Sequence, residues 1–151
     1  MVESGCLCMF MGEYNHTIDT KGRLIIPSKY RDQLGEEFVL TKGLEGCLFV
    51  YPTNAWEEFA ESLEKLPLTK KDARKYLRFF MSGAAQCEMD KQGRILVSPV
   101  LREYAGLDKE VVLAGVGKRI EIWDKAKWNE CALDGDMDEI AENLEDLGIG
   151  L

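Results

Sequence analysis

The chain has 151 residues, of which 46% are hydrophobic and 30% charged; this balance excludes a disordered or fibrous protein and indicates one domain, or at most two very small ones. No segment approaches the ~20 apolar residues of a membrane-spanning helix, and the first residues lack the features of a signal peptide, so we expect a cytoplasmic protein. The net charge of −8 comes mostly from residues 132–151, which hold seven acidic residues and no Lys or Arg, so the rest of the chain is nearly neutral and nucleic acid is not excluded as a partner.

The sequence contains an internal repeat. Residues 19–35, DTKGRLIIPSKYRDQLG, match residues 90–106, DKQGRILVSPVLREYAG, at a constant offset of 71. We therefore expect one unit of ~50 residues to be present twice. The expected division is a first unit at 14–56, connecting helices at 57–82, a second unit at 83–128, and an acidic C-terminal helix and tail at 129–151.

Each unit is predicted to hold four short strands and a short helix. The first two strands form a hairpin whose turn contains Gly22 or Gly93, because glycine readily adopts the positive φ of a tight turn. A short helix follows the second strand, and Ser98 before Pro99 is typical of a helix start. The predicted strands are 14–19, 23–26, 37–41 and 47–51 in the first unit, and 84–89, 94–97, 110–114 and 119–123 in the second.

Three longer helices are predicted outside the strands. The first has its N-cap at Asn54, the second spans 70–80 and is rich in Lys and Arg, and the third lies in the acidic tail. The first and the third each carry an apolar face, made by Trp56, Phe59 and Leu63 in the first and by Ile140, Leu144 and Leu147 in the third. Because these faces need a partner, we predict a homo-oligomer.

The predicted fold class is α+β, mostly β. A unit of ~50 residues with four short strands buries too little apolar surface to be stable alone. We therefore expect the two units to build one shared β-barrel, as a pseudo-dimer within a single chain, with the helices at its periphery.

The strongest candidate site is the repeated turn. In each unit an Asp precedes the turn and an Arg follows four residues later, so the carboxylate can accept N–H groups of the turn and hold the guanidinium. A guanidinium held in this way loses little entropy when it binds a phosphate or the O6/N7 edge of guanine, and nearby basic residues can add phosphate contacts. The candidate DNA-binding residues are Asp19, Lys21, Gly22, Arg23 and Arg31 in the first unit, and Asp90, Lys91, Gly93, Arg94 and Arg102 in the second.

Spacing alone leaves two interpretations of this motif open. In one the turns contact nucleic acid, and in the other the Asp–Arg pair is a structural clasp that closes a hairpin. Two copies of the motif, each beside further basic residues, support nucleic-acid binding more strongly than a single copy would. They do not decide between the two interpretations.

The sequence offers no other set of residues for chemistry. The five cysteines are an odd number and include no C-x-x-C pair, which is typical neither of a disulfide framework nor of a zinc site. The single histidine, His16, has no nucleophile or second base beside it and is expected to be packed or partly exposed. We therefore expect no catalytic residues, no metal, no cofactor and no small-molecule substrate.

Several of these segments together resemble a known family. They are MFMGEYNHTIDTKGRLIIPSKYR at 9–31, the second D-x-x-G-R at 90–94, KGLEGCLFVYP at 42–52, and the duplicated layout. They resemble the MraZ family of bacterial transcriptional regulators, which belongs to the AbrB/SpoVT-like swapped-hairpin superfold. The resemblance covers about residues 9–145, while residues 1–8 have no counterpart in the family.

The resemblance implies a sequence-specific DNA-binding protein. Such a protein generally represses the division and cell-wall gene cluster that contains its own gene, binds short direct repeats of double-stranded DNA as a ring-like homo-oligomer, and is nucleoid-associated. By position, Asp19, Arg23, Asp90 and Arg94 then belong to the surface that faces DNA. The second turn reads K-Q-G where the first reads T-K-G, so the two turns are not expected to contribute equally. The alternative is an oligomeric protein-interaction or antitoxin-like module on the same fold, without direct promoter readout.

Overall fold

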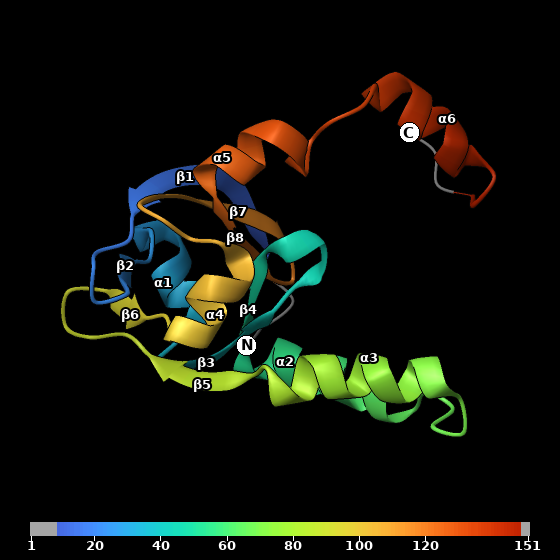
Figure 1. Cartoon of the computed structure of the whole chain (residues 1–151), viewed down its shortest axis with the longest axis horizontal. Helices are drawn as coiled ribbons and strands as arrows, with labels where there is room; N and C mark the ends of the chain where they lie inside the picture. Colours follow the sequence, from blue (N-terminus) through green and yellow to red (C-terminus); the bar gives the residue numbers. More distant parts are fainter. Residues whose placement is uncertain (1–8, 149–151) are drawn as a thin grey trace, which may run out of the picture.

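The computed structural model describes residues 9–148, so the N-terminal extension 1–8 and the last three residues of the predicted tail lie outside the described residues. The fold is α+β and mostly sheet (Figure 1). Its strands are β1 (Phe10–Thr17), β2 (Arg23–Ile25), β3 (Glu37–Lys42), β4 (Leu48–Pro52), β5 (Ala85–Glu88), β6 (Arg94–Leu96), β7 (Glu110–Gly117) and β8 (Ile120–Asp124). Its helices are α1 (Ser28–Leu34), α2 (Thr53–Glu64), α3 (Lys71–Ser82), α4 (Pro99–Ala105), α5 (Lys125–Lys127) and α6 (Met137–Glu145).

The strands form one antiparallel sheet of six strands and one of two. The six-stranded sheet has the order β1-β7-β8-β4-β3-β5, and β2 pairs with β6 in the second sheet, which we call the β2–β6 ribbon. The first strand starts earlier than the predicted residue 14, because Phe10 is buried in the core and pairs with Gly117. The eight predicted strands are thus all observed, with shifted ends.

In both sheets, strands of one repeat pair with strands of the other. The first strand of each repeat pairs with the third strand of the other, β1 with β7 and β5 with β3, and the two fourth strands β4 and β8 pair at the centre of the sheet. The strand order is therefore symmetric about the β4–β8 pair. The closed barrel and the swapped hairpins remain predictions, because the sheet of the described residues runs from β1 to β5 and these two edge strands do not pair.

The six-stranded sheet separates two apolar clusters. Side chains alternate between the faces of a strand, so on β4 Leu48 and Val50 belong to one cluster while Phe49 and Tyr51 belong to the other. The first cluster is the shared core, which takes in residues of both repeats and is covered by α1, α4 and the inner face of the β2–β6 ribbon. Both repeats contribute side chains to this core.

The second cluster lies under α2 and α3. The face of α2 that carries Phe59 and Leu63 packs here, and the Phe59 ring meets the Phe80 ring of α3 edge to face at 5.1 Å. The hydroxyl of Thr41 on β3, which is fully buried, donates to the Phe80 carbonyl at 2.9 Å and fixes the end of α3 to the sheet. The prediction that this face of α2 needs an external partner is therefore wrong, because α3 and the sheet cover it.

Helix ends agree with the sequence where a cap side chain is available. The Ser98 hydroxyl accepts from the Leu101 N–H at the start of α4, as predicted. The predicted cap at Asn54 is wrong, since α2 already begins at Thr53, whose hydroxyl donates to the Glu37 carbonyl of β3. Among residues 9–148, no helix is long and apolar enough to cross a bilayer.

We predict that both repeats unfold in one transition because they share the core. Leu113→Ala on β7 removes a fully buried side chain and is expected to lower the free energy of unfolding by about 2–5 kcal/mol. Val116→Ala on the same strand is the control, because Val116 is 44% exposed and its truncation is expected to change stability by less than about 0.5 kcal/mol. Urea unfolding followed by circular dichroism measures both; two separate transitions, or equal losses, would contradict the shared core.

Candidate nucleic-acid interface

Each repeat contains a tight turn of the same geometry. In the first, the Gly22 N–H donates to the Asp19 carbonyl at 2.9 Å, and the Asp19 N–H donates to the Arg23 carbonyl at 3.0 Å. In the second, the corresponding bonds from Gly93 to Asp90 and from Asp90 to Arg94 measure 3.0 and 2.9 Å. Gly22 and Gly93 have φ values of 88° and 79°, the positive values that the sequence predicted for a tight hairpin turn.

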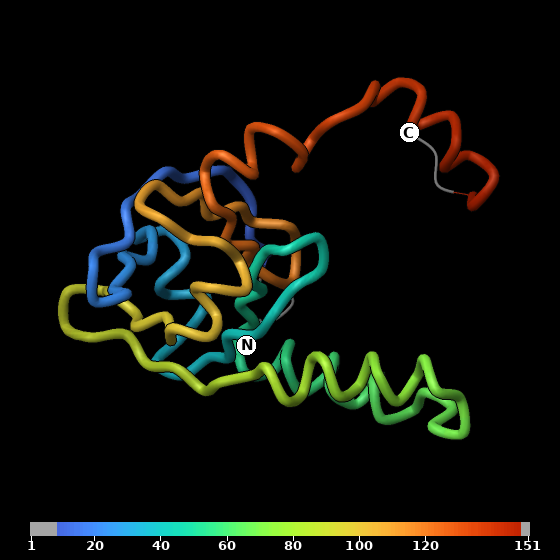
Figure 2. The backbone as a smooth tube through the Cα atoms, in the orientation of Figure 1, coloured from blue at the N-terminus to red at the C-terminus, as the bar shows by residue number. Residues whose placement is uncertain are grey.

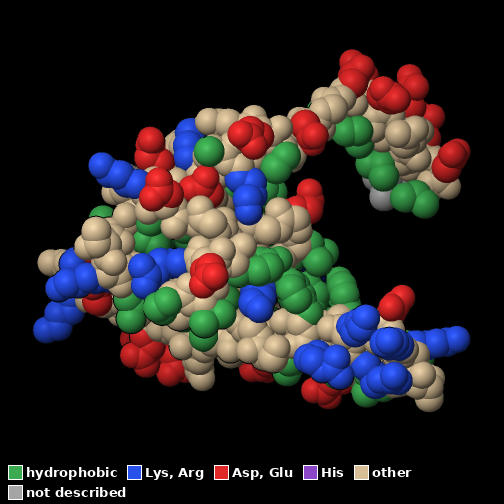
Figure 3. All heavy atoms as spheres, viewed as in Figure 1, with side chains coloured by type: hydrophobic (Ala, Val, Ile, Leu, Met, Phe, Trp, Pro, Cys, Tyr) green, Lys and Arg blue, Asp and Glu red, His purple; other side chains and the backbone are tan. Residues whose placement is uncertain are grey.

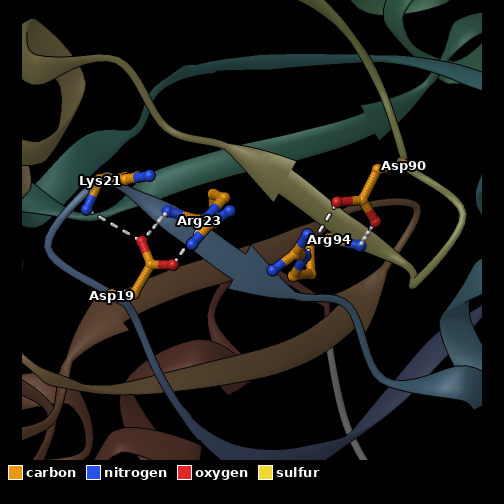
Figure 4. Close-up of polar contacts among 5 residues, drawn as sticks. All are labelled: Asp19, Lys21, Arg23, Asp90 and Arg94. Atoms are coloured by element: carbon orange, nitrogen blue, oxygen red, sulfur yellow. Dashed lines mark hydrogen bonds and ion pairs between the residues drawn. The ribbon is translucent and has the colours of Figure 1, made fainter.

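A carboxylate inside the first turn holds the arginine that follows it. One Asp19 oxygen accepts from the backbone N–H groups of Lys21 and Arg23, at 3.0 and 2.8 Å. The other accepts from Nε of Arg23 at 2.7 Å, which makes a charge-assisted bond (Figure 4). Within the described residues the Nη groups of Arg23 take no protein partner, so the outer edge of the guanidinium remains available.

The second turn reproduces this clasp despite its different sequence. Asp90 accepts from the backbone N–H groups of Gln92 and Arg94, each at 2.9 Å, and from Nε of Arg94 at 2.8 Å. Gln92 stands where the first turn has Lys21, and since only the backbone of this residue enters the clasp, the geometry is unchanged. The K-Q-G and T-K-G turns therefore differ in the side chains they expose and not in how they hold the arginine.

The two clasped arginines lie on the same face of the β2–β6 ribbon. In its register Arg23 is opposite Leu96 and Ile25 is opposite Arg94, while Leu24 and Ile95 point into the core. In Figure 4 the two guanidiniums, which come from the adjacent strands β2 and β6, lie between Asp19 and Asp90. This outer face thus consists of two basic side chains at opposite corners and two exposed apolar ones, Ile25 at 40% and Leu96 at 63% exposure.

Backbone hydrogen bonds tie each turn to the other repeat. The Val97 N–H donates to the Gly22 carbonyl at 2.8 Å, and the Ile26 N–H donates to the Gly93 carbonyl at 2.9 Å. Figure 2 shows the two turns lying next to each other at one end of the molecule. A side chain at Gly22 would approach the Val97 carbonyl to 2.7 Å, so glycine is required here by space as well as by φ.

Arg31 and Arg102 cross over to the opposite turns. The Nε of Arg31 on α1 donates to the Ile26 carbonyl at 2.8 Å, and its guanidinium lies directly against Gly93. The Nε of Arg102 on α4 donates to the Val97 carbonyl at 3.0 Å, and its guanidinium lies against Gly22. Each arginine therefore supports the turn of the repeat to which it does not belong.

Lysines and further residues complete the surface around the turns. Lys21 and Lys91 are both exposed at the turn tips. Figure 3 shows Lys and Arg side chains gathered at this end of the molecule and again on α3, while Asp and Glu dominate α6. Among the described residues no group of three or more His, Cys, Asp and Glu is arranged to hold a metal ion, and His16 is half-buried on β1.

Two features of this surface were not predicted from the sequence. Ile25 and Leu96, both exposed, were not among the candidate DNA-binding residues, because in the sequence each belongs to an apolar run that is typical of a buried strand. The crossing of Arg31 and Arg102 depends on the pairing between repeats, and the only signal for it is that both follow the clasped arginine by the same eight residues. Alternation along β2 and β6 could have identified the apolar pair.

We predict that both clasps persist in acid. The backbone N–H of Arg23, its guanidinium and the Lys21 N–H lower the pKa of Asp19, and the equivalent donors of Arg94 and Gln92 lower the pKa of Asp90. Because these pKa values are lower in the folded than in the unfolded chain, the clasps stabilise the fold above the unfolded Asp pKa of ~3.9, and this contribution is lost as pH falls through the folded values. Carboxyl carbon NMR titration is expected to give midpoints below ~3.9 for both residues.

The control for this titration is Arg23→Gln. It removes the guanidinium and leaves the backbone N–H, which is the largest cause of the shift, so the pKa of Asp19 is expected to rise part of the way to its ordinary value. The pKa of Asp90 is expected to stay where it was, since its donors lie in the other turn. Ordinary midpoints in the unchanged protein would contradict the clasps.

Comparison with known proteins identifies the family. The MraZ family model, described as "MraZ protein, putative antitoxin-like", matches residues 9–79 and again residues 80–144. The transcriptional regulator MraZ of Lachnoclostridium phytofermentans is 57% identical over 141 residues, which cover 93% of this chain and 99% of that protein. The proteins of the same name from Thermoanaerobacter sp. and Clostridium acetobutylicum are each 56% identical, over 143 and 144 residues that cover 93% of this chain and all of each relative. The chain therefore belongs to the MraZ family of transcriptional regulators.

Proposed function

We propose that this chain regulates transcription by binding double-stranded DNA through the outer face of the β2–β6 ribbon. The observation that carries the proposal is the pair of clasped guanidiniums, Arg23 and Arg94, each held by Nε on the outer face of the ribbon, with no hydrogen bond or ion pair from their Nη groups to another described residue. A purely structural clasp would need neither two copies on one face nor exposed outer edges on both arginines.

The ribbon has the shape of a major-groove reader. A two-stranded antiparallel ribbon fits the width of the major groove, and there the Nη groups of Arg23 and Arg94 can donate to O6 and N7 of guanine. Ile25 and Leu96 lie between them and offer apolar contacts of the kind that thymine methyl groups accept. Because the clasps fix both guanidiniums before binding, little side-chain entropy is lost in the complex.

The remaining candidate residues position the ribbon on the DNA backbone. In this proposal Lys21 and Lys91, which are exposed at the turn tips, contact phosphates, and such contacts give affinity without sequence information. Arg31 and Arg102 hold the turns through their Nε groups and can reach a phosphate only through Nη. Gly22 and Gly93 supply the turns themselves.

The overall charge is compatible with this role because the charges are segregated. The seven acidic residues of the tail account for most of the net charge of −8, and α6 stands away from the end of the molecule that bears the turns (Figures 1 and 3). The DNA-facing end therefore presents a local positive surface on a protein that is acidic as a whole.

Self-assembly is part of the same proposal. A single ribbon with two arginines binds weakly, and a ring-like homo-oligomer that presents several ribbons to short repeated sites makes each later contact intramolecular, which raises avidity by ~10²–10⁴. The family relation supports a repressor of the division and cell-wall gene cluster acting near the nucleoid. The pairing of each repeat's leading strands with the other repeat supports, in addition, the swapped-hairpin barrel and the division at 14–56, 57–82, 83–128 and 129–151.

A second candidate function is an oligomeric protein-interaction or antitoxin-like module. It is favoured by the antitoxin-like description of the matching family model and by the exposed apolar pair Ile25 and Leu96, which a protein partner could cover as well as DNA. The two candidates differ in what the clasped arginines do, so the following variants distinguish them.

We predict that Arg23→Ala with Arg94→Ala abolishes promoter binding. Each substitution removes one guanine contact and is expected to cost about 1–3 kcal/mol of specific affinity. The control is Lys118→Ala with Lys125→Ala, which removes the same charge outside the ribbon and is expected to change the affinity only a few-fold. Fluorescence anisotropy with a fragment from upstream of the chain's own gene, at one fixed salt concentration, measures both. Unchanged affinity of the Arg variant, with fold and assembly intact, would assign the motif to structure.

A charge-preserving variant tests base readout separately from phosphate attraction. Arg23→Lys with Arg94→Lys keeps both positive charges and loses the planar fork, so the preference for the promoter fragment over a scrambled fragment is expected to disappear. The affinity for the scrambled fragment and its dependence on salt are expected to stay nearly constant, because phosphate contacts remain. A preserved preference for the promoter would contradict guanine recognition by these arginines.

A further inference from the structure

Helix α6 carries an apolar stripe that residues 9–148 do not bury. The stripe consists of residues spaced by three and four, which share one face of the helix, namely Met137, Ile140 and Leu144, and the exposed Leu147 follows in the turn after the helix. None of the residues of α6 is buried, and Ile140 and Leu144 are each 37% exposed. A helix of nine residues is marginal in water by itself, so the stripe indicates a helix that is stabilised by a partner.

The opposite side of α6 is acidic throughout. Its acidic residues, with the N-cap, are Asp136, Asp138, Glu139, Glu142 and Glu145, and α6 contains no Lys or Arg. Within residues 9–148 none of them forms an ion pair, the pairs there being made by Asp19, Glu58, Glu61, Asp90 and Glu121. The partner that fits this helix is therefore apolar along one line and basic beside it.

The far side of the α2–α3 hairpin has these two properties. A groove of about 480 Å³ lies there, lined by the apolar side chains of Leu68, Leu77 and Met81 and by two basic residues, Arg74 and Arg78, against one acidic residue, Glu64. Leu68 and Met81 are exposed to solvent, so the groove is uncovered in the single chain.

The face of α3 beside the groove is strongly basic. Four exposed residues at helical spacing share it, Lys71, Arg74, Lys75 and Arg78. Figure 3 shows these basic side chains concentrated on α3, in contrast to the acidic surface of α6. Among the described residues none of the four forms an ion pair with a carboxylate.

We propose that α6 of one copy docks in the α2–α3 groove of the next copy and thereby links the chains of the assembly. The apolar stripe of α6 fills the groove between Leu68 and Met81, and its acidic side meets the basic face of α3. The contact combines burial of apolar surface with opposite charges, so it is specific for this pair of helices and weakens as salt is added.

The occupant is a second copy because α6 lies apart from the α2–α3 hairpin in its own chain and so leaves the groove uncovered (Figures 1 and 2). Figures 1 and 2 show α6 at the end of an extended segment, apart from the sheets, while the α2–α3 hairpin projects separately from the body. A contact between unlike surfaces is heterologous, and repetition of such a contact generates a ring when the rotation closes. The inference rests on the self-assembly proposed above and is independent of how the ribbon contacts DNA.

The test uses the full chain and follows the mass of the assembly by size-exclusion chromatography with light scattering. Ile140→Gln with Leu144→Gln removes the stripe and keeps the charges, and is expected to raise the concentration needed for assembly by about tenfold or more. Val100→Gln is the control, because Val100 is an exposed apolar residue on α4, outside both surfaces. This control is expected to assemble like the unchanged chain.

Charge reversal then tests whether the two helices meet each other. Lys71→Glu, Lys75→Glu and Arg78→Glu reverse α3, and Asp138→Lys, Glu139→Lys and Glu142→Lys reverse α6. Each set alone is expected to reduce the assembly toward the single chain of 17.1 kDa, and both sets in one chain are expected to restore it. Restoration supports the proposed pair, because a general loss of stability would be worse in the combined variant.

The other outcomes overturn the inference in distinguishable ways. If the stripe variant and the reversed variants assemble normally, α6 does not link the copies, while self-assembly itself stands. If reversal of α3 lowers DNA affinity and leaves the mass unchanged, the basic face binds nucleic acid instead. If reversal of either helix alters the NMR signals of the other at constant mass, α6 docks on its own chain. An unchanged chain that stays single at all concentrations refutes self-assembly, and DNA binding by that sample is then judged separately.

Discussion

The exchange of hydrogen bonds between the two repeats is the interaction on which the rest of the structure depends. Each turn glycine offers its carbonyl to a backbone N–H of the other repeat, Gly22 to Val97 and Gly93 to Ile26, and the short strands β2 and β6 pair between them. Each of these strands has three residues and would not be stable as an isolated hairpin. Because the pairing places Leu24 and Ile95 in the shared core, it also sets the direction of the clasped arginines, so fold and candidate site share one origin.

Local placement of charge matters more in this protein than its sum. The clasps lower the pKa values of Asp19 and Asp90, so both carboxylates stay ionised, and continue to hold their guanidiniums, to a lower pH than ordinary aspartates would. Because each aspartate is paired with its own arginine, its negative charge is compensated and adds little repulsion toward a phosphate. The acids that give the chain most of its net charge lie in α6 and directly beside it, and their charge is opposite to that of the basic face of α3.

Much of the fold could be predicted because the repeat doubles every local signal. The glycine-containing turns, the Ser98 cap and the eight strands are local features, and each follows from a few adjacent residues. The residues that cover the apolar face of α2 could not be predicted. The sequence shows that Phe59 needs an apolar partner, but it does not show that this partner is Phe80 of α3. Within the candidate site, the clasp was visible at a spacing of four residues, whereas the contact of Arg31 with Gly93 joins residues 62 positions apart and depends on the pairing of the repeats.

Fusion of the two units in one polypeptide frees the paired turns from being identical. In a homodimer every substitution in a turn would occur twice, and both halves of the ribbon would carry the same side chains at their tips. Here Thr20 and Lys21 in one turn correspond to Lys91 and Gln92 in the other, while the backbone that holds each arginine is the same. The two turns can therefore differ in the side chains that they expose while their backbone stays the same. Two identical chains in a symmetric dimer could not differ in this way.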